Sequence, residues 1–536
     1  MHTKEWQAVC GFITDACEAL SETPKTMRGL FDLITESKPA VIYSWKAGGR
    51  SLYLRRDDFR RRTISVARKL VSAHPEKGGI IGLHVAEDVY WPILYWAVLM
   101  SGHIPLILDS RRELFDYRSL KDCQGVYCIT EDKNYPWIID PDSLKDSNSE
   151  VDSAFFDHLW EDRTFFVLED AGGTLQIISH DGQSVCEQIF RLRYVYQYNQ
   201  DMLYPPHLGP MRLLLRVPLC DFFGYLSGVI LYPFYGGEVM LSPVSHKAEE
   251  TLLPGQEHMM THLCLSPEEC EAVRTEIARK AKQLFPRDEE RYIAWLNGEV
   301  RINDFRVLTR YQSISAKLKK RLLGKNIRCI LCVNLPPDTS VSLFFSQFGV
   351  FFANGSYLVE LGMISMELSC EPEARVKGSA GMLLHGVRCH AQEGDRIRLS
   401  VGEHTGKRFS NKAFYPLPDP FPVARKAAMN MHGRLCFIER MDSDEHITAA
   451  IDPQLIQKIT EIYAEVLNKP AGIIKEDMDF FNDLGGDSLS YFLLLQHLEV
   501  VFNTRIGHDE RAYFITVRYA AKTLVSNIGR VVANDA

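Results

Sequence analysis

The sequence lacks a strong excess of either charge, a long uninterrupted hydrophobic run and an N-terminal secretion signal. Its 536 residues carry 61 lysines and arginines against 69 aspartates and glutamates, so the chain as a whole gives no electrostatic support to nucleic-acid binding. The most apolar long stretch, residues 217–237, contains Asp221, two prolines and several glycines, which predicts a buried segment and no membrane span. We therefore expect a cytoplasmic protein.

Cysteines are present, but they follow no regular spacing. The closest pair among the 13 cysteines, Cys329 and Cys332, lies in an apolar, strand-like run. Residues three apart in a strand point to opposite faces of the sheet, so we expect two buried thiols and no metal site. Scattered free thiols also favour a reducing compartment.

Short apolar runs alternate with amphipathic helical patterns through most of the chain. Residues 79–85 and 103–109 are strand-like and flank a helical pattern at 89–102, which predicts parallel α/β layers. A long helical tract follows at about 268–323, and from about Glu371 the pattern becomes rich in strands and loops. We expect an α/β region of layered sheets and helices over residues 1–445.

Residues 453–536 have a purely helical pattern after a short linker at 446–452. An amphipathic helix is followed by a loop of about twenty residues, and Ser488 then opens a second helix. We expect its apolar residues Leu489, Phe492, Leu493, Leu495 and Leu498 to make core contacts. With two further helical segments near the C-terminus, the pattern predicts a small all-α four-helix bundle.

The run "DLGGDSLSYFLLL", residues 483–495, resembles the phosphopantetheine attachment motif of acyl and peptidyl carrier proteins. The resemblance implies that 4'-phosphopantetheine is attached covalently to Ser488 by a separate phosphopantetheinyl transferase. It also implies that partner enzymes dock around Gly485, Gly486, Asp487 and Leu489. The simpler alternative is that Ser488 only caps the helix.

The residue types suit this attachment. A helix N-terminus exposes the hydroxyl on a fixed element, and its free amides favour a phosphodiester. Neighbouring glycines let another protein approach closely. Acidic residues gather around the motif and suit a basic docking surface: Glu476, Asp477, Asp479, Asp483, Asp487 and Glu499.

Residues from about 30 to 440 resemble adenylate-forming enzymes, which include acyl-CoA synthetases, fatty acyl-AMP ligases and the adenylation domains of peptide synthetases. The resemblance rests on "GGIIGLHVAEDVYWPILYWAVLMSGHIPLILD", on "GVFFANGSYLVE" in the place of the run that leads to "GYGLTE", and on "KGSAGMLLHGV" in the place of "GSVGKPLPGV". It implies the fold of this family.

The departures from this family fall on its nucleotide-binding residues. Its phosphate loop, of the type "TSGSTGxPK", is replaced by "LEDAGGTLQIISH", which lacks the lysine and places carboxylates where ATP phosphates would lie. The degenerate loop comprises Glu169, Asp170, Gly172, Gly173 and Thr174.

Two further departures concern the end of this region. The threonine of "GYGLTE" is Val359, although the glutamate is kept as Glu360, and the later "TGD" aspartate has no clear counterpart. Only about ten residues separate Asp442 from the carrier-like region, whereas the mobile C-terminal subdomain that the resemblance implies is far longer. Adenylation needs charge neutralisation at the phosphates, so we expect a pseudo-adenylation domain that uses neither ATP nor magnesium.

The combined prediction is a carrier protein with a built-in scaffold and no catalytic residues of its own. A ligase or acyltransferase would load it in trans, and tailoring or condensing enzymes of nonribosomal peptide, polyketide or specialised lipid biosynthesis would use the thioester. Two alternatives stay open: a divergent but active self-loading acyl- or aminoacyl-AMP ligase, and a non-catalytic nucleotide or acyl sensor.

Overall fold

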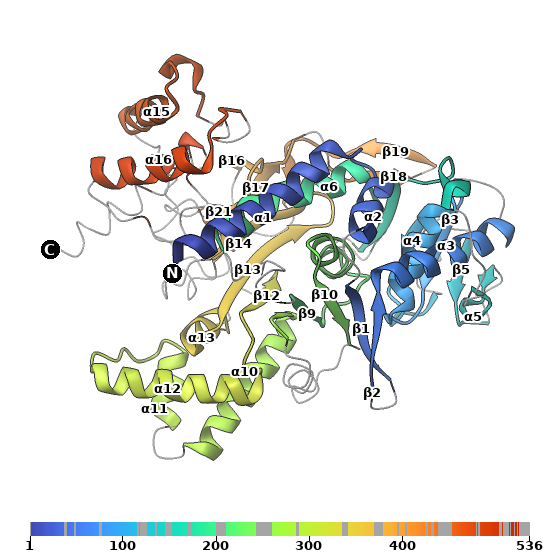
Figure 1. Cartoon of the computed structure of the whole chain (residues 1–536), viewed down its shortest axis with the longest axis horizontal. Coiled ribbons are helices and arrows are strands. Elements are labelled where there is room, and N and C mark those ends of the chain that lie inside the picture. The colour runs from blue at the N-terminus through green and yellow to red at the C-terminus, as the bar shows by residue number, and fades with distance from the viewer. Residues whose placement is uncertain are drawn as a thin grey trace.

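The computed structural model describes most of the chain and both of its expected parts (Figure 1). It describes all residues except 1, 37–39, 48–49, 74–77, 115–116, 118–119, 121–125, 134–136, 145–152, 170–173, 200–208, 210, 243–259, 286–288, 335–340, 369–378, 394–395, 403–404, 411, 424–426, 430–433, 438–452, 477, 479, 481–482, 503–505, 507–513, 515, 519, 522–523 and 525–536. The expected linker at 446–452 therefore lies outside the described residues. Within the described part, no helix has both the length and the apolarity needed to cross a bilayer.

A sheet of eleven described strands forms one half of the N-terminal region. Its central strands β1, β10, β9, β11, β12 and β13 pair in parallel, and antiparallel strands continue it on both sides. In order across the sheet the strands are β2 (Arg50–Arg55), β1 (Val41–Ala47), β10 (Glu238–Leu241), β9 (Arg212–Leu215), β11 (His262–Cys264), β12 (Cys329–Val333), β13 (Phe351–Leu358), β14 (Gly362–Glu367), β15 (Ser379–Leu383), β22 (Arg434–Phe437) and β21 (Ala427–Met429).

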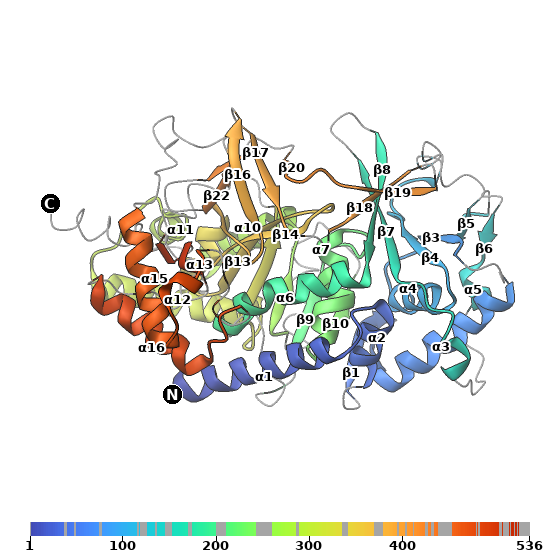
Figure 2. The ribbon, with the colours of Figure 1, turned by 90° about the horizontal axis from the view of Figure 1, so that it is seen from above.

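A second sheet of eight described strands stands beside it (Figure 2). Its order is β19 (Ala413–Pro416), β18 (Lys407–Ser410), β8 (Leu175–Asp181), β7 (Arg163–Glu169), β4 (Ile104–Ile107), β3 (Ile80–His84), β5 (Tyr127–Thr130) and β6 (Ile138–Ile139). A small third sheet contains β16 (Arg388–Glu393), β17 (Arg396–Ser400) and β20 (Phe421–Pro422). These mixed α/β layers agree with the expected fold class of the N-terminal region.

Helices cover both faces of the large sheet. The main core lies between the two large sheets and includes side chains of α1 (His2–Glu22), α2 (Met27–Glu36), α3 (Arg56–Ala73), α4 (Tyr90–Met100) and α6 (Gly182–Tyr198). A second core on the opposite face includes α10 (Pro267–Leu284), α11 (Glu289–Leu296), α12 (Phe305–Leu322) and α13 (Val341–Phe348). A short helix, α5 (Pro141–Leu144), follows β6.

Strand β12 shows how the sequence pattern produces these two cores. Cys329 contributes to the core between the sheets and Cys332 to the core on the opposite face, and both are fully buried. This follows from the alternation of side chains along a strand. The prediction of two buried thiols on opposite faces is confirmed.

The apolar stretch at 217–237 is buried, as predicted. It forms α7 (Phe222–Tyr225), a π-helical turn (Leu226–Leu231) and α8 (Tyr232–Phe234) inside the main core. The Asp221 carboxylate caps α7 by accepting hydrogen bonds from the amides of Phe223 and Gly224. This aspartate therefore begins a helix and does not interrupt one.

The C-terminal region has its own small core. Its described regular elements are α15 (Pro453–Leu467), a 3-10 turn (Ala471–Ile473) and α16 (Ser488–Val501), with further helical residues between 517 and 524. Side chains from all of these segments except the 3-10 turn meet in one apolar cluster. The helical nature of this region agrees with the sequence, while the four-helix count stays a prediction.

Candidate functional site

The start of α16 is fixed by Asp487. Its carboxylate accepts a hydrogen bond of 2.7 Å from the amide of Ser490, and the Ser490 hydroxyl accepts one of 2.8 Å from the amide of Asp487. This reciprocal capping box satisfies two amides that would otherwise have no partner. Ser488 is the first helical residue, and the interpretation of Ser488 as the cap is wrong because Asp487 has that role.

The two glycines before Ser488 are required by the local backbone. Gly485 has a φ of 67°, in the left-handed region that glycine adopts without strain. A Cβ atom on Gly486 would come within 2.2 Å of the Phe480 ring, which packs in the carrier core between Tyr463 and Tyr491. The glycines thus set the turn into α16, and their part in partner docking stays a prediction.

Helix α16 has apolar side chains on all sides. Tyr491, Leu494, Leu495 and Leu498 face the carrier core. The expectation of core contacts was wrong for Phe492 and Leu493, which are 42% and 47% exposed, and Val500 is exposed as well. Two solvent-exposed apolar side chains, Phe492 and Leu493, therefore lie in the second turn of this helix.

Several of the predicted acidic docking residues already have partners within the domain. Glu476 forms an ion pair of 2.9 Å with Arg518, and Glu499 accepts a hydrogen bond from the amide of Ile506. Asp487 caps α16, whereas Asp483 is exposed. Asp477 and Asp479 lie outside the described residues. The described carboxylates therefore stabilise the fold of the carrier as well as charging its surface.

The degenerate phosphate loop joins two antiparallel strands, β7 and β8. Glu169 pairs with Leu175 in the ladder, so only five residues connect the paired positions. Of the predicted loop residues, Asp170, Gly172 and Gly173 lie outside the described residues, and Thr174 is exposed. Glu169 forms an exposed ion pair of 2.7 Å with Arg112, which compensates its charge.

Val359 and Glu360 form the turn between β13 and β14, and both carbonyl groups are engaged. The Val359 carbonyl lies 2.6 Å from Nε2 of His180. A carbonyl can only accept, so Nε2 carries the proton, and Nδ1 accepts from the Ser184 hydroxyl at 2.6 Å. The Glu360 carbonyl accepts from the amide of Gly406 at 2.9 Å.

Burial decides the charge of the ionisable groups at this turn. Burial in an apolar surrounding lowers the pKa of His180 to about 4, so the ring is neutral near pH 7. Burial also raises the pKa of the Glu360 carboxyl, against a smaller lowering effect from Arg408. Neither group offers the fixed positive charge that a polyphosphate requires.

The described residues of the predicted nucleotide site are distributed along strand β8. Glu169 and Thr174 lie at the loop end of the β7–β8 hairpin, whereas Val359 contacts His180 at the other end of β8. The five residue steps from Leu175 to His180 span about 17 Å along an extended strand. The ends of the β7–β8 loop at Glu169 and Thr174 therefore lie near one end of β8, and the β13–β14 turn at Val359 contacts the other end.

Tyr357 is a residue of this region that the sequence analysis missed. When "GSYLVE" is aligned with "GYGLTE", the second glycine of the motif is replaced by Tyr357. The Tyr357 hydroxyl donates a hydrogen bond of 2.5 Å to the Asp221 carboxylate, and its ring stacks on Phe222 and Phe223 at centroid distances of 5.8 and 6.5 Å. A large ring thus occupies the position where the family has no side chain, and the six aligned letters could have revealed it.

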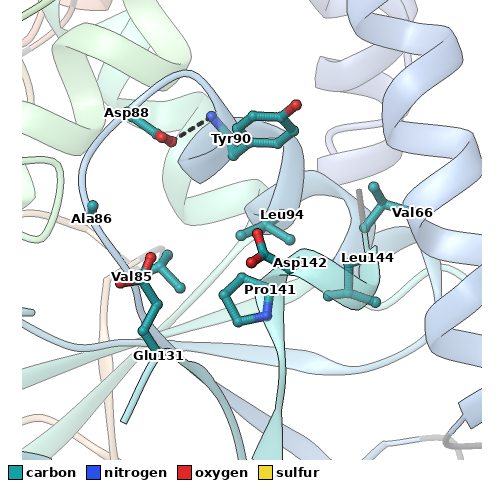
Figure 3. A pocket seen from close by; sticks show the side chains of 10 residues that line it. All are labelled: Val66, Val85, Ala86, Asp88, Tyr90, Leu94, Glu131, Pro141, Asp142 and Leu144. Atoms are coloured by element: carbon teal, nitrogen blue, oxygen red, sulfur yellow. Dashed lines mark hydrogen bonds between the residues drawn. The ribbon is translucent and has the colours of Figure 1, made fainter. Parts of the chain in front are cut away.

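A small hollow lies at the carboxyl ends of the parallel strands β3 and β5 (Figure 3). Its cavity of about 50 Å³ is lined in part by Asp88, Glu131 and Asp142. Figure 3 shows the Asp88 carboxylate turned toward the amide of Tyr90, from which it accepts a hydrogen bond of 2.8 Å. The cavity is too small for a nucleotide, and no residue of the predicted nucleotide site lines it. Among the described residues, no cluster of three or more histidine, cysteine or acidic side chains could hold a metal ion.

The folds and the start of α16 define a carrier domain that is joined to an adenylation-like domain. Residues 457–510 match the family described as "Phosphopantetheine attachment site". A stretch of 76 residues is 34% identical to an acyl carrier protein of Prochlorococcus marinus (strain MIT 9515), covering 14% of this chain and 95% of that protein. Through this domain, the chain belongs to the acyl carrier protein family.

Solved structures resemble the whole chain or its N-terminal part. O-succinylbenzoate coenzyme A synthetase (MenE) of Bacillus subtilis, in complex with AMP, has a TM-score of 0.54 and 13% identity over 77% of this chain and 98% of that chain. The N-terminal subdomain of Klebsiella oxytoca NpsA, in complex with 3-hydroxyanthranilyl-AMSN, has a TM-score of 0.52 and 11% identity over 77% and 99%. The nonribosomal peptide synthetase FmoA3 has a TM-score of 0.53 and 12% identity over 98% of this chain but only 54% of that chain. The N-terminal region therefore has the fold of adenylate-forming enzymes.

The carrier domain indicates 4'-phosphopantetheine as a covalent cofactor and a phosphopantetheinyl transferase as a partner. The residues present fit this group. Ser488 stands at the first position of α16, beside the exposed Gly485 and Asp487, and the start of this helix is capped by Asp487 and Ser490.

Proposed function

We propose that the protein is a phosphopantetheine-dependent carrier on a catalytically degenerate adenylation-like scaffold, with Ser488 as the attachment residue. A separate ligase or acyltransferase loads an acyl or aminoacyl group in trans. Tailoring or condensing enzymes of natural-product or specialised lipid biosynthesis then act on the tethered group. Residues 1–445 form the scaffold and residues 453–536 the carrier, and the protein works in the cytoplasm.

The start of α16 supports the role of Ser488. Asp487 and Ser490 cap the helix, so other residues fill the capping role. The positive end of the helix dipole favours the negative charge of a phosphodiester at this position. When bound, the cofactor supplies a thiol that holds the cargo as a thioester.

Tyr357 is the observation that carries the proposal of a degenerate scaffold. Its ring fills the position of a motif glycine, and its hydrogen bond to the half-buried Asp221 fixes it there. Glu169 adds a negative charge at the phosphate loop, with an exposed arginine as its partner. These features oppose the charge neutralisation that ATP phosphates require, and they support the proposal of a degenerate scaffold.

Two measurements on the same purified protein test the proposal. With a phosphopantetheinyl transferase and coenzyme A, we expect the intact mass of the wild type to rise by one phosphopantetheine group. Ser488→Ala abolishes the gain, while the matched control Ser490→Ala keeps it because Ser488 is untouched. An unmodified wild type would contradict the carrier role.

The second measurement is pyrophosphate exchange with ATP in the presence of fatty, aryl and amino acids. We expect no exchange that depends on the acid. Substrate-dependent exchange would overturn the degenerate scaffold in favour of a self-loading ligase. Heat released on titration with ATP or AMP, without exchange, would favour the sensor alternative.

A further inference from the structure

A groove lies between the carrier and the scaffold. Its larger hollow, about 420 Å³, is lined by the β15–β16 turn of the scaffold and by Asp483, Thr516 and Arg518 of the carrier. A second hollow of about 330 Å³ is bounded by α6 and by residues near the end of α1. Both hollows are lined by His385 and Gly386, so they adjoin as two parts of one groove.

The carrier is held over this groove by an aromatic contact. Tyr194 of α6 is 2% exposed and belongs to the apolar cluster of the carrier, not to the cores of the scaffold. Its ring also meets His385 edge to face at 5.6 Å. A buried tyrosine of this kind is a typical anchor of a domain interface, so the groove belongs to the described arrangement of the two domains.

The groove has a positive lining. Four arginines and one lysine line it against two carboxylates. Some of these cations are already engaged: Arg518 pairs with Glu476, Lys25 with Glu187, and Arg191 donates to two backbone carbonyls. Arg388 is exposed in the groove, and within the described part of the chain no ion pair or hydrogen bond engages its guanidinium.

The attachment residue is within reach of this groove. The five residue steps from Asp483 to Ser488 span at most about 18 Å, whatever their conformation. An extended 4'-phosphopantetheine arm has a comparable length, so its far end can enter a groove that Asp483 lines. The groove also offers apolar side chains, among them Phe190, Val387 and Val401, against which an acyl chain can lie.

We propose that this groove receives the cargo end of the arm and favours an acyl group that bears a second, anionic group such as a carboxylate. This inference rests on the proposed attachment at Ser488 and adds the class of cargo. Arg388 is the principal contact of the anionic group, because a charge-assisted hydrogen bond to an unengaged guanidinium is strong. A thioester held in the groove is also shielded from external nucleophiles.

The test compares two cargoes of equal chain length on the intact protein. A promiscuous transferase attaches glutaryl- or valeryl-phosphopantetheine from the matching acyl-coenzyme A, and hydroxylamine cleavage of each thioester is followed by intact mass. For each cargo, the cleavage rate of Arg388→Ala is divided by that of the wild type. We expect a ratio of about ten or more for glutaryl, as for the loss of one charge-assisted hydrogen bond, and a ratio near one for valeryl.

The controls separate the possible failures. Arg301→Ala removes an exposed arginine that lines neither hollow and should leave both rates unchanged, and Arg388→Lys should keep most of the protection. If Arg388→Ala does not fold, the wild type still gives a test, because added NaCl should speed glutaryl cleavage more than valeryl cleavage. Equal ratios for both cargoes, or no salt effect, would overturn the cargo proposal. No mass gain at all would instead contradict the attachment at Ser488.

Discussion

His180 shows how a single buried residue makes the scaffold sensitive to pH. Its ring is fully buried and fixed by hydrogen bonds at both nitrogens, to Val359 and to Ser184. Protonation would place a positive charge on the ring in an apolar surrounding. It would also put a hydrogen on Nδ1, which in the neutral ring accepts the hydrogen bond from the Ser184 hydroxyl. Folding therefore favours the neutral ring, and below its ordinary pKa the ring is charged only in the unfolded chain until the pH reaches about 4.

The stability of the scaffold should fall with acid in the window that His180 sets. Its pKa is 6.5 in the unfolded chain and about 4 in the folded protein. Between these values the unfolded chain binds the proton, so the contribution is complete above pH 6.5 and is lost as the pH falls toward 4. We expect a loss of about 3 kcal/mol in the free energy of unfolding across this window.

Urea unfolding at several pH values, followed by tryptophan fluorescence, measures this loss. All seven tryptophans lie at or before Trp295, so the signal reports on the scaffold alone. His180→Gln should flatten the pH dependence, whereas His158→Gln, at an exposed site, should keep it. The same slope in wild type and His180→Gln would show that other groups cause the acid sensitivity.

At the scale of elements, the start of α16 depends on a glycine that no periodicity reveals. Gly486→Ala would force its Cβ against the Phe480 ring, so the carrier core must shift. Overpacking of this kind typically costs about 1–3 kcal/mol. We expect faster amide exchange over residues 480–502, measured by hydrogen–deuterium exchange with mass spectrometry.

Gly472 provides the matched control for this change. It lies in the 3-10 turn of the same domain, and a Cβ atom there would meet nothing within 4 Å. Gly472→Ala should therefore leave the exchange of α16 unchanged. Equal protection in Gly486→Ala and wild type would show that Phe480 moves aside at little cost.

Periodicity predicted those elements in which one face alone is buried, and it was weaker elsewhere. The alternation in β12 placed Cys329 and Cys332 correctly because side chains in a regularly paired strand point to alternate faces. Helix α16 is apolar on every side, so its sequence did not reveal that Phe492 and Leu493 are exposed. The replacement of a motif glycine by Tyr357 is visible in the sequence, but its hydrogen bond to Asp221, 136 residues away, leaves no local pattern.

At the scale of the whole molecule, the arrangement of carrier and scaffold depends on Tyr194. The sequence predicted the two domains but not their contact, because a tyrosine on an amphipathic helix has no feature that marks it as an interface residue. Its burial against the carrier core makes it the natural target for separating the domains. A carrier held in place can keep its cargo in the groove, whereas a released carrier exposes it to every enzyme.

Tyr194→Ser should free the carrier from the scaffold without unfolding either domain, because truncating a buried aromatic anchor commonly costs 2 kcal/mol or more of contact energy. We expect a larger radius of gyration by small-angle X-ray scattering and an unchanged circular dichroism spectrum. The control Tyr415→Ser, at an exposed tyrosine of β19, should scatter like the wild type. An unchanged radius of gyration in Tyr194→Ser would mean that other contacts suffice to hold the carrier. An increase would identify this side chain as the element that decides whether the cargo is sheltered or offered to partner enzymes.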